Sequence, residues 1–394
     1  MQMLRKGRRT EIKIVFITHY DNMYGANRAM YHLMVRLKKE YGEEPVVIIP
    51  AEGEMTRCLA EEGIRYHIHS VTQWQAVYSG PVRFLVKKMI RKRNISRELI
   101  SLTKLCKAEQ PDCIYSNSSV IGIGAMLAEK IGCRHIWHIR EFSKEHFHMR
   151  YFYPRKRVCR LYEQADCLVT ISDALKKNYM KKYPKAKIVR IYDGVSIVAA
   201  DRESFFEKRP VRFCYVGYLF PMKHQEQVLE ACKLLNNAGF TDYELYLVGG
   251  GKEEYQRLLR TKIKTEQLHQ VKLTGYIDDV HAFLDSMDIG IIASEYEGFG
   301  LVTVEYMLHG MPVIGRNSGG TPEIIQDAVT GYLYDETEEL YQAMKQLMQS
   351  PDQVRKMGEA GRKRAKECFT EEKNAQAVAE LIQKVQKGEI TCSS

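Results

Sequence analysis

The stretch between residues 288 and 323 constrains the fold more than any other part of the sequence. An apolar run of the kind found in buried strands comes first, and an acidic, glycine-rich turn follows it. Apolar residues at helical spacing come next and stop at Gly310, which is placed to act as a C-cap. The expected elements are a strand at 288–293, a turn at 295–300, a helix at 301–309 and a strand that starts at 311. A strand, a glycine turn and a helix in this order are typical of a doubly wound α/β sheet.

The turn between this strand and this helix predicts a site for an anionic ligand. The N–H groups of Phe299, Gly300 and Leu301 would point out of the helix start, where they attract a phosphate. Glu305 lies one turn further in and can accept hydrogen bonds from a vicinal diol, while Glu297 lies in the loop on the other side of the helix start. Two carboxylates beside a phosphate-binding turn indicate a nucleotide sugar. For an isolated E-x7-E pair, solvated acids at a helix start are the simpler explanation.

The strand–turn–helix pattern starts twice along the chain, which predicts two domains. It first occurs at residues 12–39, with the turn at 18–27, and starts again at residues 211–236, with the turn at 217–224. Residues 196–210 lose all periodicity and are expected to form the linker. A chain of 394 residues is too long for one core and has the size of two ordinary domains.

The residues around the two glutamates, EGFGLVTVEYMLHGMPVIGRNSGGTPEII, resemble the donor site of the retaining glycosyltransferases of group 1 (family 4). The resemblance extends over nearly the whole chain. It implies the GT-B fold, in which two Rossmann-like α/β/α domains face each other across a deep cleft. Residues 1–197 would bind the acceptor, residues 208–369 would bind a nucleoside-diphosphate sugar, and a C-terminal helix within 370–394 would pack back on the first domain.

The same resemblance implies roles for individual residues. Glu305 would hold the nucleotide ribose, Glu297 would lie near the transferred sugar, and Lys223 would neutralise the donor diphosphate as a catalytic cation. The remaining donor contacts would be Gly25, Gly217, Tyr218, Gly249, Gly250, Tyr276, Ile277, Gly298, Phe299, Gly300 and Leu301.

The loop that carries Lys223 departs from the family pattern at one position. The family loop reads G-R-L-x-x-x-K-G, whereas this chain has Tyr218 in place of the arginine. One cation is therefore missing from the expected leaving-group site. Either Lys223 and a helix dipole suffice, or another cation such as Arg316 substitutes.

Two polar residues of the first half lie within a predicted strand and loop at 135–142. His138 and Arg140 lie where a parallel strand ends, which is the usual ligand edge of such a sheet. A lone histidine is more often structural, but the resemblance implies that His138 faces the cleft near the transferred sugar. We therefore expect His138 to be the third catalytic residue and Arg140 to contact the acceptor.

The net charge of +10 is concentrated in the first half of the chain. Residues 1–200 contain 36 Lys or Arg and 19 Asp or Glu, whereas residues 201–394 contain 23 and 30. A basic half indicates an anionic partner. Within it, residues 82–100 show helical spacing and contain Arg83, Lys87, Lys88 and Arg91, which could contact an acceptor or an anionic membrane surface or form a solvated helix face. The segment 146–160 has the same alternatives. No nucleic-acid-binding motif accompanies the charge, so we expect no nucleic-acid partner.

Composition limits the compartment and the cofactors. The ten cysteines are scattered without a C-x-x-C pair, which argues against zinc and against a disulfide framework. The basic N-terminus is followed by no apolar signal region. We expect a cytoplasmic protein, or a peripheral one on the inner face of the cell membrane. No metal or cofactor is expected beyond a donor of the UDP or GDP type, and the acceptor would be a lipid-linked or polysaccharide precursor.

Two other functions remain compatible with the sequence. A nucleotide-sugar epimerase of the same fold would act on the donor without an acceptor. A non-catalytic scaffold that binds nucleotide sugars would explain Tyr218 and a first loop in which Gly25 is the only clear glycine of the family's pair. A dinucleotide dehydrogenase is disfavoured because residues 19–27 contain no G-x-G-x-x-G.

Overall fold

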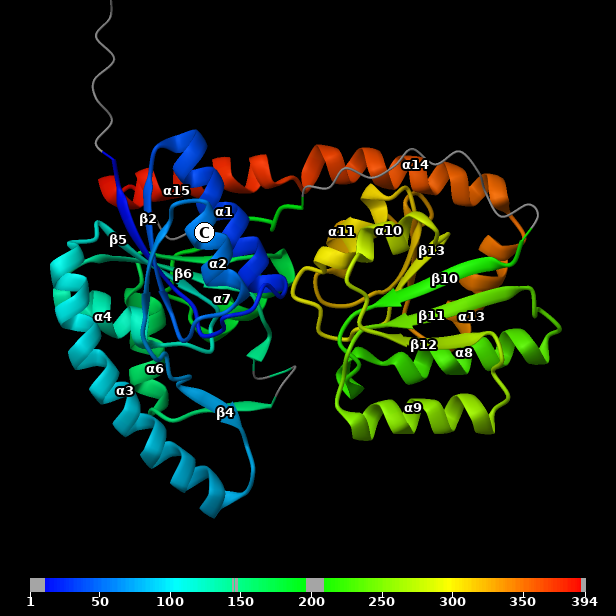
Figure 1. The fold of residues 1–394 in the computed structure, drawn as a ribbon, viewed down its shortest axis with the longest axis horizontal. Coiled ribbons are helices and arrows are strands. Elements are labelled where there is room, and N and C mark those ends of the chain that lie inside the picture. The colour runs from blue at the N-terminus through cyan, green and yellow to red at the C-terminus, as the bar shows by residue number, and fades with distance from the viewer. Residues whose placement is uncertain (1–10, 144, 146–147, 196–208, 391–394) are drawn as a thin grey trace, which may run out of the picture. The chain divides into compact units, whose positions relative to one another are not determined.

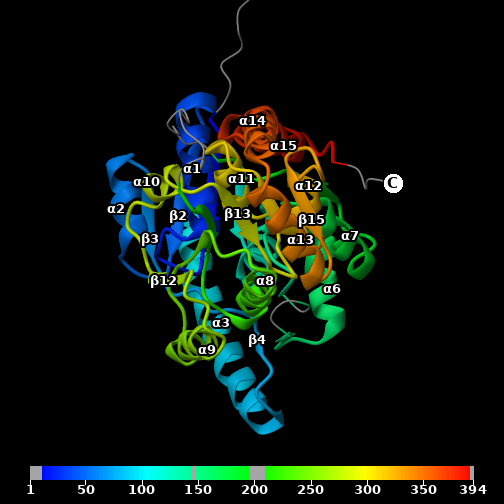
Figure 2. The same ribbon diagram turned by 90° about the vertical axis from the view of Figure 1, so that its right-hand side faces the viewer.

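The computed structural model describes residues 11–143, 145, 148–195 and 209–390, and these fall into two compact units. Unit 1 contains the described residues up to Ile171, together with Lys176–Ile191 and those from Asn374 onward. Unit 2 contains Ser172–Leu175 and the described residues within Tyr192–Lys373. Each unit is a parallel sheet with helices on both faces (Figures 1 and 2).

Unit 1 is built on a seven-stranded parallel sheet in the order β3-β2-β1-β5-β6-β8-β9, with a small antiparallel pair, β4 and β7, beside it. The strands are β1 (Lys13–Ile17), β2 (Glu44–Ile49), β3 (Arg65–Ile68), β4 (Gln75–Val77), β5 (Cys113–Asn117), β6 (Arg134–Ile139), β7 (Met149–Tyr151), β8 (Cys167–Thr170) and β9 (Ile188–Arg190). The helices are α1 (Gly25–Tyr41), α2 (Glu54–Glu61), α3 (Pro81–Glu109), α4 (Ile123–Ile131), α6 (Arg155–Gln164), α7 (Asp173–Lys182) and α15 (Glu371–Lys387).

The last helix, α15, completes the core of unit 1. Apolar residues recur along it at helical spacing, and Ala375, Val378 and Ile382 are buried with Phe16 of β1 and Leu33 of α1 in one cluster. The expected return of the C-terminal helix to the first domain is therefore present in the fold. Helix α1 ends at Gly42, whose left-handed φ of 67° closes it.

Unit 2 is built on a six-stranded parallel sheet in the order β12-β11-β10-β13-β14-β15. The strands are β10 (Val211–Val216), β11 (Tyr243–Val248), β12 (Val271–Gly275), β13 (Ile289–Ile292), β14 (Val313–Arg316) and β15 (Gly331–Tyr334). The helices are the 3-10 turn η1 (Pro221–Lys223), α8 (Gln225–Asn237), α9 (Glu253–Thr265), α10 (Val280–Asp285), α11 (Leu301–Leu308), α12 (Thr321–Ile324), α13 (Thr337–Met348) and α14 (Pro351–Cys368).

The strand order of each sheet reverses beside its first strand. In unit 2 the chain moves from β10 outward to β11 and β12, then returns to the other side of β10 with β13. Loops that leave two such strands diverge to opposite faces and open a crevice at the carboxyl edge, where ligands bind in open α/β sheets. The loops after β10 and β13 contain Lys223 and Glu297, so the topology brings these two residues to the same edge.

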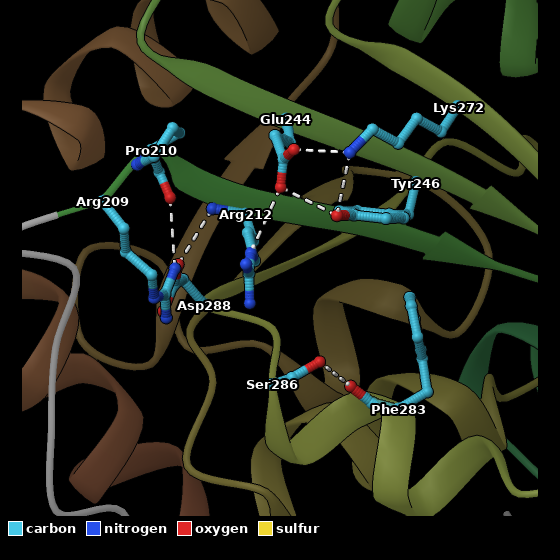
Figure 3. Close-up of polar contacts among 9 residues, drawn as sticks. All are labelled: Arg209, Pro210, Arg212, Glu244, Tyr246, Lys272, Phe283, Ser286 and Asp288. Atoms are coloured by element: carbon cyan, nitrogen blue, oxygen red, sulfur yellow. Dashed lines mark hydrogen bonds and ion pairs between the residues drawn. The ribbon is translucent and has the colours of Figure 1, made fainter.

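At the amino ends of the unit 2 strands, charged side chains form ion pairs (Figure 3). Asp288, fully buried at the start of β13, accepts two hydrogen bonds from the guanidinium of Arg209, at 2.7 and 2.9 Å, and one from the backbone N–H of Arg212 at 2.9 Å. Glu244 at the start of β11 accepts from Lys272 and Tyr246. These paired charges satisfy the amino ends of the strands and leave the carboxyl edge for a ligand.

The structure differs from the sequence prediction in several boundaries. The first unit was expected to continue to residue 197, but Tyr192 already stacks on Phe299 at 5.5 Å within unit 2. The helix predicted at 82–100 runs from Pro81 to Glu109. Of the segment 146–160, residues 146–147 lie outside the described residues, and Met149–Tyr151 forms strand β7, which pairs with β4, before helix α6 begins. Of the predicted linker 196–210, residues 196–208 lie outside the described residues.

Tyr306 of α11 links the helix to the strand that precedes the Lys223 loop. Its hydroxyl accepts a hydrogen bond of 2.7 Å from the backbone N–H of Val216, the last residue of β10. Its ring occupies the space above Gly290 of β13, where a Cβ atom would lie only 2.1 Å from the ring. A glycine inside a buried strand is therefore explained by the aromatic ring that packs on it.

Replacement of Gly290 by valine should lower the free energy of unfolding by roughly 1–3 kcal/mol, because the added side chain overlaps the Tyr306 ring. Denaturation by urea measures the loss. In the double variant Gly290→Val/Tyr306→Ala, the total loss should be smaller than the sum of the single losses, since the ring that causes the overlap is gone. If the losses of unfolding free energy were strictly additive, the Tyr306 ring would not be the reason that position 290 requires glycine.

Candidate functional site

The loops that follow β10, β11 and β12 are held together by backbone hydrogen bonds. The N–H of Gly217 donates to the carbonyl of Val248 at 2.9 Å, and the N–H of Leu219 donates to Gly250 at 2.8 Å. The N–H of Gly249 donates to the carbonyl of Gly275, also at 2.8 Å. Three predicted donor contacts are thus brought to one place, since Gly217 lies about thirty residues before Gly249 and Gly250 in the sequence.

Glycine is required at some of these positions by contact distance. Gly249 has φ of 135°, and a Cβ atom on it would lie 2.1 Å from the carbonyl oxygen of Gly217. A Cβ on Gly251 would lie 2.5 Å from the carbonyl oxygen of Leu219. Gly250 is different, because a Cβ there meets no atom within 4 Å. The run of three glycines therefore contains two positions fixed by packing and one with open space, as a ligand would need.

The acidic loop after β13 rests on the glycine pair after β14. The N–H of Gly320 donates to the carbonyl of Glu297 at 2.8 Å, and a Cβ on Gly319, whose φ is 58°, would lie 2.4 Å from that same oxygen. The hydroxyl of Ser318 donates to the carbonyl of Glu295 at 2.7 Å. The loop that carries Glu297 is therefore positioned by its backbone, which leaves its side chain available for other contacts.

Lys223 and Glu297 form an ion pair with 2.7 Å between Nζ and Oε2. Both side chains are partly exposed, at 26% and 19%. Lys223 ends the turn η1, and its carbonyl accepts a hydrogen bond of 2.8 Å from the hydroxyl of Tyr215. Burial alone would lower the pKa of Lys223, but the attraction of Glu297 outweighs it and the pKa is raised above the ordinary lysine value. The lysine is therefore an ammonium group at neutral pH.

The start of α11 lies beside this pair. Gly300 precedes the helix with φ of 97°, and a Cβ on it would come within 3.2 Å of the Glu297 side chain. Gly298 and Phe299 are buried, and Leu301 begins the helix. Glu305 lies in the middle of α11 and is only 2% exposed, so the structure places its carboxylate below the surface.

Two aromatic side chains lie on the surface of the same edge. Tyr218, in the loop after β10, is 55% exposed, and Tyr276, directly after β12, is 69% exposed. Ile277 follows Tyr276 and is half-buried. Arg316, considered from the sequence as a substitute cation, is the last residue of β14 and therefore ends at this edge as well.

In unit 1, His138 lies in a buried polar network at the carboxyl edge of the sheet. It is the penultimate residue of β6, and its Nδ1 is 2.8 Å from the hydroxyl of Tyr115 and 3.4 Å from Nη2 of Arg140. Burial, and secondarily the charge of Arg140, lower the pKa of His138 well below its ordinary value, so the ring is neutral.

Arg140 belongs to this network rather than to the surface of the unit. It is 8% exposed, and its Nε donates to Oδ1 of Asn117 at 2.6 Å. Asn117 in turn donates to the carbonyl of Ala26 at 3.2 Å, which connects the network to the first loop. Gly25 opens α1 in that loop, and a Cβ on it would meet no atom within 4 Å. The other four basic residues singled out from the sequence, Arg83, Lys87, Lys88 and Arg91, lie on the first half of α3.

Two family models match consecutive parts of the chain. The family described as Glycosyltransferase Family 4 matches residues 23–198, and the family described as Glycosyl transferases group 1 matches residues 198–364. The chain belongs to the group 1 glycosyltransferases.

Known proteins resemble this glycosyltransferase in sequence, and a solved structure resembles it in fold. An uncharacterised glycosyltransferase of Methanocaldococcus jannaschii is 25% identical over 338 residues, which cover 82% of this chain and 90% of the relative. The N-acetyl-alpha-D-glucosaminyl L-malate synthase of Bacillus anthracis is 37% identical over 223 residues, 54% of this chain and 58% of the relative. The crystal structure of HepE of Anabaena in complex with UDP and glucose superposes with a TM-score of 0.78 at 19% identity, over 95% of this chain and 100% of that one. The fold of this glycosyltransferase is GT-B.

Sequence reasoning did not identify three residues that shape the site of this glycosyltransferase. Tyr306 lies within the predicted helix at 301–309, Tyr215 lies within the predicted segment 211–236, and the sequence analysis assigns no role to Asn117. Aromatic and small polar residues at these places carry no sequence signal of a contact. A tyrosine directly after the proposed ribose carboxylate, in a helix made mostly of apolar residues, was the one visible hint.

Substitution of Gly249 by alanine should lower the thermal midpoint of the glycosyltransferase, because the new Cβ cannot share space with the Gly217 carbonyl. The cost should be on the order of 1–3 kcal/mol, as for other non-glycine residues in strained backbone. Gly250→Ala is the matched control, since its Cβ enters open space and its midpoint should stay near that of the wild type. Equal midpoints for the two variants would contradict the close approach.

Proposed function

We propose that this glycosyltransferase moves a sugar from a nucleoside-diphosphate sugar to a glycan or lipid-linked acceptor, with retention of the anomeric configuration. The observation that carries the proposal is the ion pair of Lys223 and Glu297 beside the glycine-rich start of α11, at the strand-order reversal of unit 2. A cation, a carboxylate and a helix start at one place match the parts of such a donor: a diphosphate joined to a sugar with many hydroxyls.

The donor diphosphate would lie between Lys223 and the start of α11. The loops at Gly217, Gly249 and Gly250 offer the backbone room that a phosphate needs, and Gly298, Phe299, Gly300 and Leu301 offer their N–H groups. Glu305 would accept hydrogen bonds from the ribose hydroxyls. The exposed ring of Tyr276, with Ile277 and Tyr218, would lie along the base. A UDP or GDP sugar is the donor we propose.

In the proposed reaction, the bond between the anomeric carbon and the diphosphate oxygen breaks, and the acceptor hydroxyl forms a new bond to the same carbon. The nucleoside diphosphate leaves with the electron pair, and its departing oxygen takes up the proton that the acceptor hydroxyl loses. Lys223 and the helix start would stabilise the negative charge that develops on the leaving oxygen, which is the largest contribution we assign. Glu297 would orient the ammonium group and contact the sugar. Neutral His138 of unit 1 is the third catalytic residue we propose, and it would act as a hydrogen-bonding group.

Replacement of Lys223 by alanine should lower turnover about a hundredfold or more, because the leaving diphosphate loses its main cation. Sugar transfer is measured as release of the nucleoside diphosphate in the presence of an acceptor. Lys252→Ala, which removes an exposed lysine at the start of α9 in the same unit, should retain normal turnover. Near-normal turnover in Lys223→Ala would remove this residue from the mechanism.

Thermal-shift screening tests the donor site directly. UDP, GDP and their sugars are tested, including UDP-glucose and a donor of N-acetylglucosamine, since HepE was crystallised with UDP and glucose and the Bacillus anthracis relative is named for an N-acetylglucosaminyl product. One nucleotide series should raise the midpoint, and Glu305→Ala should abolish the shift because the ribose loses its carboxylate. A shift that persists in Glu305→Ala would contradict the ribose assignment.

The two competing functions give different products in the same assays. Isomerised donor without an acceptor would identify an epimerase. Donor binding without any turnover would identify a scaffold and make Tyr218, which replaces a cation at the diphosphate loop, the first residue to restore to arginine.

A further inference from the structure

The first half of α3 carries a surface that the donor site does not use. The helix is 29 residues long, and its buried residues begin only at Ile95. Ahead of Ile95, the helix extends beyond the strands of unit 1 in both views (Figures 1 and 2). None of the helices that the structure describes, α3 included, has the length and apolar character of a membrane-spanning helix.

An apolar stripe runs along this exposed half. Val82, Leu85, Val86, Met89 and Ile90 are spaced three or four residues apart and therefore share one face of the helix. Their side chains are exposed at 73, 55, 50, 66 and 54%. Single exposed apolar residues are ordinary, but five on one helix face form a patch that marks an interaction surface.

The stripe is held facing away from the body of unit 1. Phe84 lies on the opposite face of the helix, where its ring packs against Tyr78 at 5.6 Å and Phe152 at 5.5 Å. One helical turn after the stripe ends, Ile95 enters the buried part of the unit. Anchors at both ends fix the rotation of α3, so the apolar face cannot turn inward to bury itself.

The charges that flank the stripe are all of one sign. Between Glu62 and Glu98 the sequence contains eight Lys or Arg residues and no acid. Glu98 itself faces inward, where it accepts hydrogen bonds from the N–H and the hydroxyl of Thr72 at 2.9 and 2.6 Å. The basic residues Arg83 and Lys87 are exposed beside the stripe.

We infer that the first half of α3 lies in the surface of an anionic lipid bilayer, with Val82, Leu85, Val86, Met89 and Ile90 inserted at the boundary of the acyl chains. An apolar face with basic flanks and no carboxylate is the pattern of helices that lie in membrane interfaces. Lipid phosphates attract the flanking cations, and apolar burial then holds the helix. The inference deepens the acceptor part of the proposed function, because a lipid-linked acceptor would be met at this surface.

Vesicle flotation tests the inference without any use of the donor site. The full chain should bind vesicles that contain phosphatidylglycerol, bind phosphatidylcholine vesicles far less, and lose binding at high salt. Leu85→Glu/Met89→Glu should weaken binding by roughly tenfold or more, because two carboxylates enter the apolar face. Leu258→Glu, which places a carboxylate at a 44% exposed leucine of α9 in unit 2, is the matched control and should bind as the wild type does.

Two outcomes would overturn the inference. One is equal flotation of the wild type and Leu85→Glu/Met89→Glu, or no flotation of either. The other is a concentration-dependent dimer of the wild type in the absence of lipid that the double variant abolishes, since the stripe would then be a protein interface. Leu85→Glu/Met89→Glu and Leu258→Glu should both retain the thermal shift with nucleotide. Flotation therefore tests the membrane inference, and the thermal shift tests the donor proposal separately.

Discussion

Direct packing of backbone on backbone is the constraint on which the unit 2 site depends. Gly249 lies against the carbonyl of Gly217, Gly319 against that of Glu297, and Gly331 against that of Val313, each closer than any Cβ atom allows. Main-chain atoms have few degrees of freedom, so contacts of this kind position the loops more narrowly than side-chain packing does. The side chains that the loops carry, Lys223 and Glu297, are consequently presented on a rigid edge.

The sequence predicted Lys223 and Glu297 separately, and the structure joins them in one ion pair. Its members are 74 residues apart in sequence, and each compensates for the partial burial of the other. Because the ammonium group is already held by the carboxylate, an arriving diphosphate would meet a cation whose position is set in advance. Less side-chain entropy is then lost on binding than with a free lysine. In the proposed donor site, the absence of the family's arginine at Tyr218 would leave more of the electrostatic stabilisation of the diphosphate to this one pair.

The sequence was informative about elements and about motifs, and less so about contacts across the fold. Hydrophobic periodicity and glycine positions predicted the strands that precede the glycine turns and the helix after Gly300, whereas the return of the C-terminal helix was implied by the family resemblance. The contact of Tyr306 with Gly290 and Val216 could not be predicted, because it joins three elements whose approach only the folded sheet defines. Likewise, the apolar and basic pattern of α3 was visible, but the pattern does not say which face turns outward. That depends on Phe84 and its partners Tyr78 and Phe152.

The place of α15 in the core of unit 1 has a consequence for how the chain folds as it is made. Domains generally fold as units during synthesis, the N-terminal one first. Here the part of the unit 1 core that α15 covers stays exposed until the ribosome has synthesised Ala375, Val378 and Ile382, which come after the whole of the second unit. The nascent first unit must therefore wait, with part of its core open to water, for the last helix of the described chain.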